Sequence, residues 1–478
     1  MALTSAQESV LEQIIEAFQN GKRLSDLPDV KGTNPYNLLV EVLDEDGESK
    51  KAALASLLPY AEEQVSYGIE FDTSVSSPSC LRIGNGDLHR VLPVQSRMKG
   101  CLLDDSGKVV EYLNPKDWTG NTRDGSRGQV MVEIPLHYRK FETDGTKRRV
   151  RLSELPLPGY HQVPRMYVSA YEASVQRSTK MLASVVNDSV DYRGGNNDAS
   201  FDGTYRSLLG RPATNLRRID FRAYARKRKP ETAEWNCMTY EIQKTLYWFF
   251  CVEYATLNSQ ADYNAALTTE GLRQGGLGAG VATLIEDWGT FNNCNPFVPC
   301  GHTDSLGNGT GTVQYTVLKE DKSEWKTFSV PRYRGVENPF GHIWKFMDGI
   351  NISISPSTDN RGDGLSKVFV CSDPSKFNDS NYTGYSHVGN AARESGWSKE
   401  VIFGEYGEII TAVVGGGSTT YHCDYHKTYI PYTYFMSVAM LGGSAQNGKI
   451  EGFACSDLTN AAGVSCADCG SRLCFLPK

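Results

Sequence analysis

The strongest helical pattern in the chain lies between residues 236 and 258. Apolar side chains recur there at intervals of three and four residues, at Ile242, Leu246, Phe249, Phe250 and Leu257. Because this spacing puts them on one side of a helix, we expect the helix to pack against a sheet. A second helical pattern covers residues 5 to 20, where Ser5 and Glu8 have the spacing of a capping box. Its apolar stripe is wider than so short a helix can bury alone, so we expect it to pack on another chain or on a copy of itself.

Strand patterns occupy much of the remaining chain. Residues 39 to 43 predict a strand, the acidic stretch DEDGES predicts a turn, and residues 51 to 55 predict the returning strand. Further along, Val130, Val132 and Ile134 alternate with other residues, which places their side chains on one face of a strand.

These patterns divide the chain into three parts. We expect an attachment or oligomerisation module at residues 1–64, a β-rich intermediate region at 65–165 and a larger domain at 166–478. Between residues 270 and 440, short strand patterns alternate with glycine-rich turns. A few helices with many short antiparallel strands predict a fold of the α+β class.

The composition argues against several classes of function. The chain has 478 residues, enough for two or three domains, and its formal net charge of −7 argues against nucleic acid as the main partner. The first 18 residues lack the basic start and apolar centre of a signal peptide. No stretch approaches the ~20 apolar residues that cross a bilayer. We therefore expect synthesis in the cytoplasm, cysteines in the thiol form and no insertion into a membrane.

The candidate chemical motifs are weak. No glycine-rich stretch continues as GK[ST], so these glycines predict turns, and the basic run 217–229 predicts a solvated helix face. His422 and His426 have the i, i+4 spacing of helical metal ligands, but a strand would hold them ~13 Å apart, which favours a structural role. The oxygen-rich stretches 196–203 and 359–364 do not fit a calcium-loop frame, and turn chemistry accounts for both.

Four cysteines lie near the end of the chain, at Cys455, Cys466, Cys469 and Cys474. Cys466 and Cys469 form a C-x-x-C pair, but a closed zinc site needs four ligands and a redox pair needs a helix that this stretch does not predict. No carboxylate pair or Cys/His couple stands out as catalytic. From the sequence we expect no metal, no cofactor and no catalytic residue.

The C-terminal part of the chain contains a frame of small and apolar residues. The frame comprises Leu441-Gly442-Gly443, Gly452-Phe453-Ala454, Asn460-Ala461-Ala462 and Gly470 to Phe475. With this frame the chain resembles variable proteins diversified by diversity-generating retroelements, which have a C-type-lectin-like fold related to formylglycine-generating enzymes. Segments 337–350 and 403–425 also resemble phage members of this group. The resemblance implies a C-type-lectin-like domain over residues 166–478.

The N-terminal hairpin carries a second resemblance. Its strand, acidic turn and following KKAALASLL are similar to hairpin modules near the virion-attachment ends of phage tail-fibre proteins. A generic hairpin remains the alternative.

The first resemblance implies a variable segment at about residues 430–475, in which the positions between frame residues change freely and contact a ligand. Those positions are Tyr432, Thr433, Tyr434, Phe435, Met436, Ser437, Gln446, Lys449, Glu451, Asp457, Thr459, Val464, Cys466 and Asp468. In such proteins asparagine codons are randomised, and Cys469 would be one more outcome. Met436, Gln446, Lys449 and Glu451 need other template codons or belong to the frame. Aromatic residues beside Ser, Thr and Asp are typical of a paratope, so Tyr432, Tyr434 and Phe435 are the expected anchors of one exposed surface.

The function implied by the resemblance is that of a phage receptor-binding protein in the tail fibre or tail tip. Its partners would be a bacterial surface receptor, either protein or glycan, and other proteins of the virion tail. We expect a homo-oligomer and consider a trimer. The related enzymes use a paired cysteine before their terminal G-x-R motif, and the corresponding stretch LGGSAQNGKIEG has none, so we expect no enzyme. A tail-associated hydrolase, an oxidase of the formylglycine type and a structural fibre spacer are the alternatives.

Overall fold

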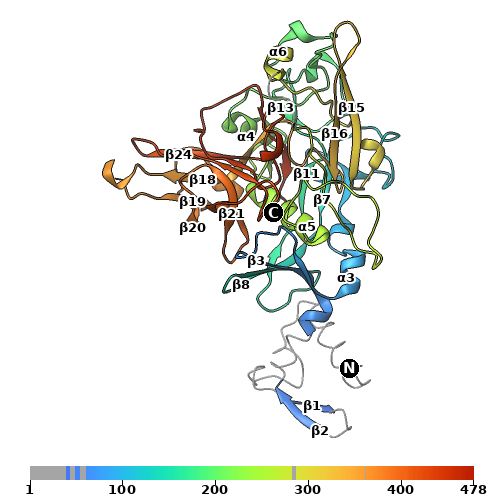
Figure 1. Ribbon diagram of the computed structural model, residues 1–478. Coiled ribbons are helices and arrows are strands. Elements are labelled where there is room, and N and C mark those ends of the chain that lie inside the picture. Colours follow the sequence, from blue (N-terminus) through green and yellow to red (C-terminus); the bar gives the residue numbers. More distant parts are fainter. Residues whose placement is uncertain (1–38, 44–48, 54–60, 283–286, 361) are drawn as a thin grey trace.

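The computed structural model describes residues 39–43, 49–53, 61–282, 287–360 and 362–478 (Figure 1). The helix expected at residues 5 to 20 lies outside them. The expected hairpin is confirmed, because β1 (Leu39–Leu43) pairs antiparallel with β2 (Ser49–Ala53). The returning strand begins at Ser49, two residues before the expected position.

One six-stranded sheet joins the beginning, middle and end of the described chain. Its strands, in spatial order, are β14 (Trp235–Cys237), β27 (Leu473–Phe475), β11 (Met166–Ser169), β7 (Gln129–Ile134), β5 (Lys99–Leu103) and β6 (Val109–Tyr112). The sheet therefore spans the boundary that the sequence suggested at residue 165. In β7, Val130, Val132 and Ile134 all enter the main core cluster, while Met131 enters a second cluster on the other face. The predicted shared face is confirmed, and the strand is buried on both sides.

The largest sheet extends to one side of the molecule (Figure 1). Its main path is β20 (Ser386–Asn390), β19 (Ser366–Val370), β18 (Trp344–Ile354), β24 (Phe435–Leu441), β25 (Ser456–Asp457), β23 (Tyr425–Lys427), β21 (Gly396–Phe403) and β22 (Glu408–Val414). β26 (Cys469–Gly470) pairs in parallel with β18. β18 and β24 thus lie in the interior of the sheet, with β24 between β18 and β25.

Smaller sheets and short helices complete the fold. A five-stranded sheet has the order β10 (His161–Val163), β8 (His137–Asp144), β9 (Lys147–Ser153), β3 (Tyr67–Asp72) and β4 (Leu81–Gly84). Two further sheets consist of β12 (Ser174–Gln176) with β13 (Met181–Ala183), and of β15 (Gly311–Leu318), β16 (Glu324–Tyr333) and β17 (Val336–Glu337). The α-helices that lie wholly within the described residues are α3 (Gly86–Val91), α4 (Arg218–Arg226), α5 (Tyr240–Tyr254) and α6 (Trp288–Asn292), and residues 61–65 are also helical. The 3-10 helices are η3 (Gln95–Arg97), η4 (Val190–Tyr192), η5 (Ala199–Phe201), η6 (Asp304–Leu306), η7 (Thr358–Asn360), η8 (Pro374–Lys376) and η9 (Gly448–Ile450).

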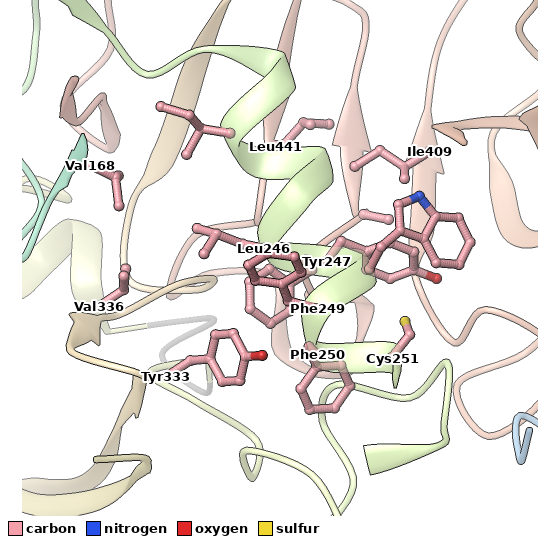
Figure 2. Packing of buried hydrophobic residues seen from close by; sticks show 14 of the residues in the cluster. Val168, Leu246, Tyr247, Phe249, Phe250, Cys251, Tyr333, Val336, Ile409 and Leu441 are labelled. Atoms are coloured by element: carbon pink, nitrogen blue, oxygen red, sulfur yellow. The ribbon is translucent and has the colours of Figure 1, made fainter. Parts of the chain in front are cut away.

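Helix α5 lies at the centre of the core (Figure 2). Thr239 caps its start by accepting from the Ile242 amide, and the left-handed conformation of Ala255 ends it. The helix is therefore shorter than the pattern at 236–258, whose first residues belong to β14. Almost every α5 side chain is buried, and the Trp248 indole donates to the Gly407 carbonyl at 2.7 Å. A helix with apolar residues around most of its circumference is expected to be buried on all sides.

Helix α4 corrects the prediction for the basic run at 217–229. Arg218 and Arg222 are buried rather than solvated. The Arg218 guanidinium pairs with Asp379 at 2.6 Å, and that of Arg222 pairs with Asp379 at 2.8 Å and with Asp348 at 2.5 Å. Their partners lie more than a hundred residues away in the chain, so the local charge pattern gave no sign of them.

The described elements confirm the α+β class, with helices set among mostly antiparallel sheets. None of the helices in the described part of the chain is long and apolar enough to cross a membrane.

Candidate functional site

Strand β24 connects the two parts of the expected variable segment. Its start pairs with the end of β18, where Phe435 lies opposite Ile354, and its end leads through Leu441 into the glycine pair Gly442-Gly443. At about 3.3 Å per residue, the seven residues of β24 hold the segments before and after it ~20 Å apart. The residues expected on one surface are therefore divided between two ends of a buried strand.

The segment before β24 is the exposed end, which we call the tyrosine tip (residues 432–434). The Tyr432 side chain is 88% exposed and that of Tyr434 is 64% exposed, and Thr433 between them is also exposed. Tyr429 and Ile430, just before the tip, are exposed as well. So many large apolar or aromatic side chains in one short segment are unusual for a surface without a partner.

Phe435 and Met436 differ from the tip because they are only partly exposed. The Phe435 ring packs against the main core cluster and lies 5.4 Å from the Tyr429 ring. Hydrogen bonding to Asp363 raises the pKa of Lys367 of β19, and the Tyr434 hydroxyl acts in the same direction. Phe435 therefore joins the exposed tip to the core.

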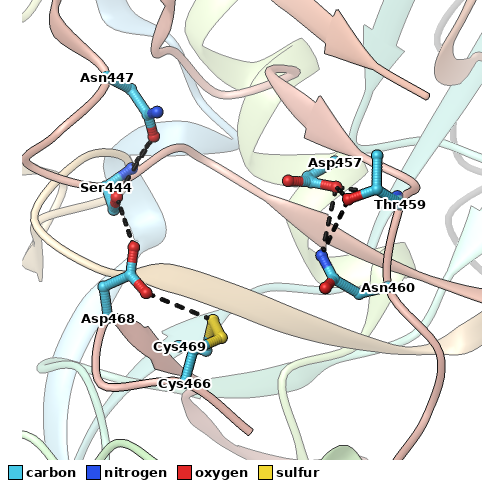
Figure 3. The surroundings of a disulfide bond; sticks show 8 residues. All are labelled: Ser444, Asn447, Asp457, Thr459, Asn460, Cys466, Asp468 and Cys469. Atoms are coloured by element: carbon cyan, nitrogen blue, oxygen red, sulfur yellow. Dashed lines mark hydrogen bonds between the residues drawn. A yellow bond between two sulfur atoms is a disulfide. The ribbon is translucent and has the colours of Figure 1, made fainter. Parts of the chain in front are cut away.

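At the opposite end of β24, polar side chains bond to one another around a turn (Figure 3). The Ser444 hydroxyl donates to Asp468 at 3.0 Å, and the Ser444 amide donates to the Asn447 side chain at 2.7 Å. Gln446 and Lys449 are exposed here. This end is therefore polar, with hydrogen bonds among Ser444, Asn447 and Asp468 and exposed side chains at Gln446 and Lys449.

The C-x-x-C pair is also at this end. Cys466 and Cys469 form a disulfide, which corrects the expectation that all cysteines are thiols. The other ten cysteines are free, and eight of those ten are buried. Cys474 belongs to the core in β27, as its place in the frame suggested. Cys466 is only partly buried, so the disulfide borders the surface.

Three of the expected ligand-contacting residues are buried, which corrects their placement on an exposed surface. Ser437, Glu451 and Asp457 all point into the protein. The Ser437 hydroxyl donates to the Leu458 carbonyl at 2.7 Å, and Asp457 accepts from the amide of Thr459 at 2.8 Å. The side chains of Ser437 and Asp457 satisfy backbone groups, a role that sequence spacing does not separate from exposure. The partly exposed positions are Phe435, Met436, Thr459, Val464, Cys466 and Asp468.

Glu451 belongs to a buried charged network that the sequence did not predict. Neither of its carboxylate oxygens has a hydrogen-bond partner among the described residues, and burial raises the pKa of this carboxyl well above its usual range. Lys345 of β18 pairs with Glu172 at 2.8 Å, and His342 bonds the other side of Glu172 at 2.5 Å. Burial opposes ionisation of Glu172, but Lys345 and His342 together lower its pKa to about 2. The network lies beneath the polar end of β24 and connects it with segments hundreds of residues away.

The structural role expected for the two histidines is confirmed. His422 lies 2.8 Å from the Tyr247 hydroxyl, and His426 lies 2.9 Å from the Ser456 hydroxyl. Both rings are buried, and burial lowers the pKa of each to about 4. In the stretch 196–203, Asp198 accepts from the Ser200 amide at 2.9 Å, which is turn chemistry.

Comparison with known proteins gives little similarity. No protein-family model matches the chain, and no curated protein matches it. Among solved structures the chain is similar to PvdO from Pseudomonas aeruginosa, with 10% sequence identity and a TM-score of 0.33. The alignment covers 75% of this chain and 98% of that chain.

The expectation that the present chain is not an enzyme is not upheld. We withdraw that expectation and assign no activity in its place.

Proposed function

We propose that the chain is a phage receptor-binding protein of the tail fibre or tail tip, which adheres to a bacterial surface receptor through the tyrosine tip. The observation that carries the proposal is the exposure of Tyr432 and Tyr434 directly before a buried strand. Tyrosine offers a large contact area with few rotatable bonds and a hydroxyl for hydrogen bonding, so it is favoured in binding surfaces. A rigid sheet beneath such residues reduces the entropy lost on binding.

The finer parts of the proposal come from the sequence resemblance. We propose a C-type-lectin-like domain at residues 166–478, a diversified segment at about 430–475, and an N-terminal module at 1–64 that attaches to other tail proteins of the virion or forms a homo-oligomer, for which a trimer is considered. Exposure supports a contact role for Tyr432, Thr433, Tyr434, Gln446 and Lys449, because these side chains are accessible. The receptor would be a protein or a glycan.

The experiment compares a double variant, which carries both Tyr432→Ala and Tyr434→Ala, with a matched control. The control replaces Tyr205 and Tyr406, which are exposed tyrosines elsewhere on the described surface. Aromatic anchors commonly contribute ~2 kcal/mol each to an interface, so the tip variant is expected to lower adsorption to host cells at least about a hundredfold. The control is expected to adsorb normally, and both variants are expected to keep the wild-type melting temperature.

Two outcomes would contradict the proposal. Normal adsorption by the tip variant would place the receptor contact elsewhere, and equal loss in both variants would show that the effect is not specific to the tip. A separate test of diversification is the neighbouring DNA, where a near-copy of codons 430 to 475 beside a reverse transcriptase gene is expected.

A further inference from the structure

We propose that Cys466, Asp468 and Cys469 bind a thiophilic divalent cation, such as Zn²⁺, when the disulfide between the two cysteines is reduced. One ligand atom from each residue lies within 4.8 Å of the others. Two thiolates and one carboxylate are ligands that Zn²⁺ accepts in tetrahedral sites. The site lies at the other end of β24 from the tyrosine tip.

The backbone of this turn is held in place by bonds to distant segments. The Cys466 carbonyl accepts from the Asn215 amide at 2.9 Å, and the Asp468 carbonyl accepts from the Trp344 amide at 2.8 Å. Cys469 lies in β26, opposite Trp344 of β18. The three candidate ligands therefore keep their relative positions without relying on the disulfide alone.

The Asp468 carboxylate is oriented towards the sulfur atoms. One oxygen accepts from the Ser444 hydroxyl at 3.0 Å, and the other lies 3.7 Å from the Cys469 sulfur (Figure 3). A hydrogen bond from a neighbouring side chain is the usual way in which a metal-binding carboxylate is positioned. Ser444 is thus a positioning residue for the proposed site.

The fourth position of a tetrahedral site remains for water. Cys455 and Cys474, which the sequence offered as further ligands, are buried, and Cys474 lies 3.7 Å from the Met238 sulfur in the core. Cys466 and Asp468 are partly exposed, so solvent has access to the cation. A site with three protein ligands and one open position exchanges its metal and a small ligand more readily than a closed structural site.

The chemistry balances with a dithiol as the reductant. The dithiol transfers two electrons and two protons to the disulfide, which gives two cysteine thiols and the cyclic disulfide of the reductant. Zn²⁺ then binds the two thiolates, and two protons are released to solvent. Oxidation of the thiols would expel the cation, because a disulfide sulfur is a poor ligand.

The test uses the full chain, reduced and then freed of reductant without oxygen, and titrated with Zn²⁺ or Cd²⁺ alone. Reduced wild-type protein is expected to bind one equivalent tightly, with thiolate-to-metal absorption in the ultraviolet when Cd²⁺ is used. The oxidised protein is the control of identical sequence and is expected to show neither signal. Asp468→Asn should weaken binding at least about tenfold while both thiols remain. Cys294→Ser, which removes a partly buried free thiol near Asp468, should change nothing.

Protection from alkylation gives a readout that does not depend on a folded variant. Bound Zn²⁺ is expected to slow modification of Cys466 and Cys469 in the reduced wild-type protein, as measured by peptide mass spectrometry, and to leave Cys294 equally reactive. Absence of a stoichiometric site in the reduced protein would overturn the proposal. Unchanged affinity in Asp468→Asn, or in the double variant Cys466→Ser with Cys469→Ser, would do the same.

Discussion

The two ends of β24 belong to one continuous segment, yet their surroundings are opposite in character. Before the strand, Tyr432 and Tyr434 extend into solvent. After the strand, the chain passes over buried charges, where Glu451 lies near Lys345 and Glu172. Residues of similar type in this segment therefore have different roles. Substitutions in the exposed tip should change binding, and substitutions of the buried charged residues at the other end should change folding.

The largest expected effect is a loss of stability at the end of β24 that lies over the buried charged network. Replacing Lys345 by Met removes the cation between two buried carboxyls, and breaking a buried ion pair in this way typically costs 3–5 kcal/mol. We expect a loss of about that size in the free energy of unfolding, measured by urea denaturation. The matched control is Lys449→Met, an exposed lysine at the same end, which should change the stability by less than about 0.5 kcal/mol. Equal losses in the free energy of unfolding for the two lysine variants would contradict the distinction between the buried charged network and the exposed surface.

The second largest expected effect is the loss of stability on replacing Phe435, which lies directly after the tyrosine tip. Phe435→Ala removes a ring that is packed against the core on one side. We expect a loss of about 2 kcal/mol, roughly half that of a fully buried phenylalanine. Tyr432→Ala serves as the control and should cost less than about 0.5 kcal/mol, because its ring is exposed. If Tyr432→Ala destabilised the protein as much as Phe435→Ala, the tip would be part of the core rather than a contact surface.

The smallest effect is the pH dependence contributed by Glu451. Burial raises the pKa of this carboxyl in the folded protein above its ordinary value of 4.5. Below pH 4.5 both states hold the proton, so the group contributes no pH dependence there. Above that pH the unfolded state loses the proton while the folded state keeps it, and stability falls by up to about 1.4 kcal/mol per pH unit until the raised pKa is reached.

The measurement is the free energy of unfolding as a function of pH for wild type and Glu451→Gln. The variant lacks the titrating group, so its stability should fall less steeply between pH 4.5 and neutral pH. Glu405→Gln, at an exposed position, should follow the wild-type curve. Parallel curves for wild type and Glu451→Gln would mean that Glu451 titrates normally and is not buried without a partner.

Local patterns in the sequence predicted several elements correctly. The hairpin at β1 and β2, the shared face of Val130, Val132 and Ile134, and the buried helix α5 all depend on neighbours within a few residues. The ends of α5 were less well predicted, because the cap at Thr239 and the left-handed Ala255 depend on single residues rather than on periodicity. The structural role of His422 and His426 was also predicted, although by assuming a strand, whereas His422 lies in a turn and only His426 lies in a strand, β23.

Several failed predictions involve residues whose surroundings come from distant parts of the chain. Arg218 and Arg222 appeared in a basic run typical of a solvated face, but Asp348 and Asp379 bind them in the interior. Ser437 and Glu451 fitted the spacing of exposed variable positions, yet both are buried. A charge or hydroxyl in the sequence does not reveal whether the fold supplies a partner for it.

By itself, the sequence determined the α+β class, the main periodic elements and the aromatic character of the segment before β24, because these depend on residue type and short-range spacing. Only the tertiary structure decided which residues of that segment are exposed. The physical reason is that burial is a property of the neighbours in space. The Arg472 guanidinium, for example, donates to the carbonyl of Ser169 at 3.1 Å, and these residues are 303 positions apart in the chain.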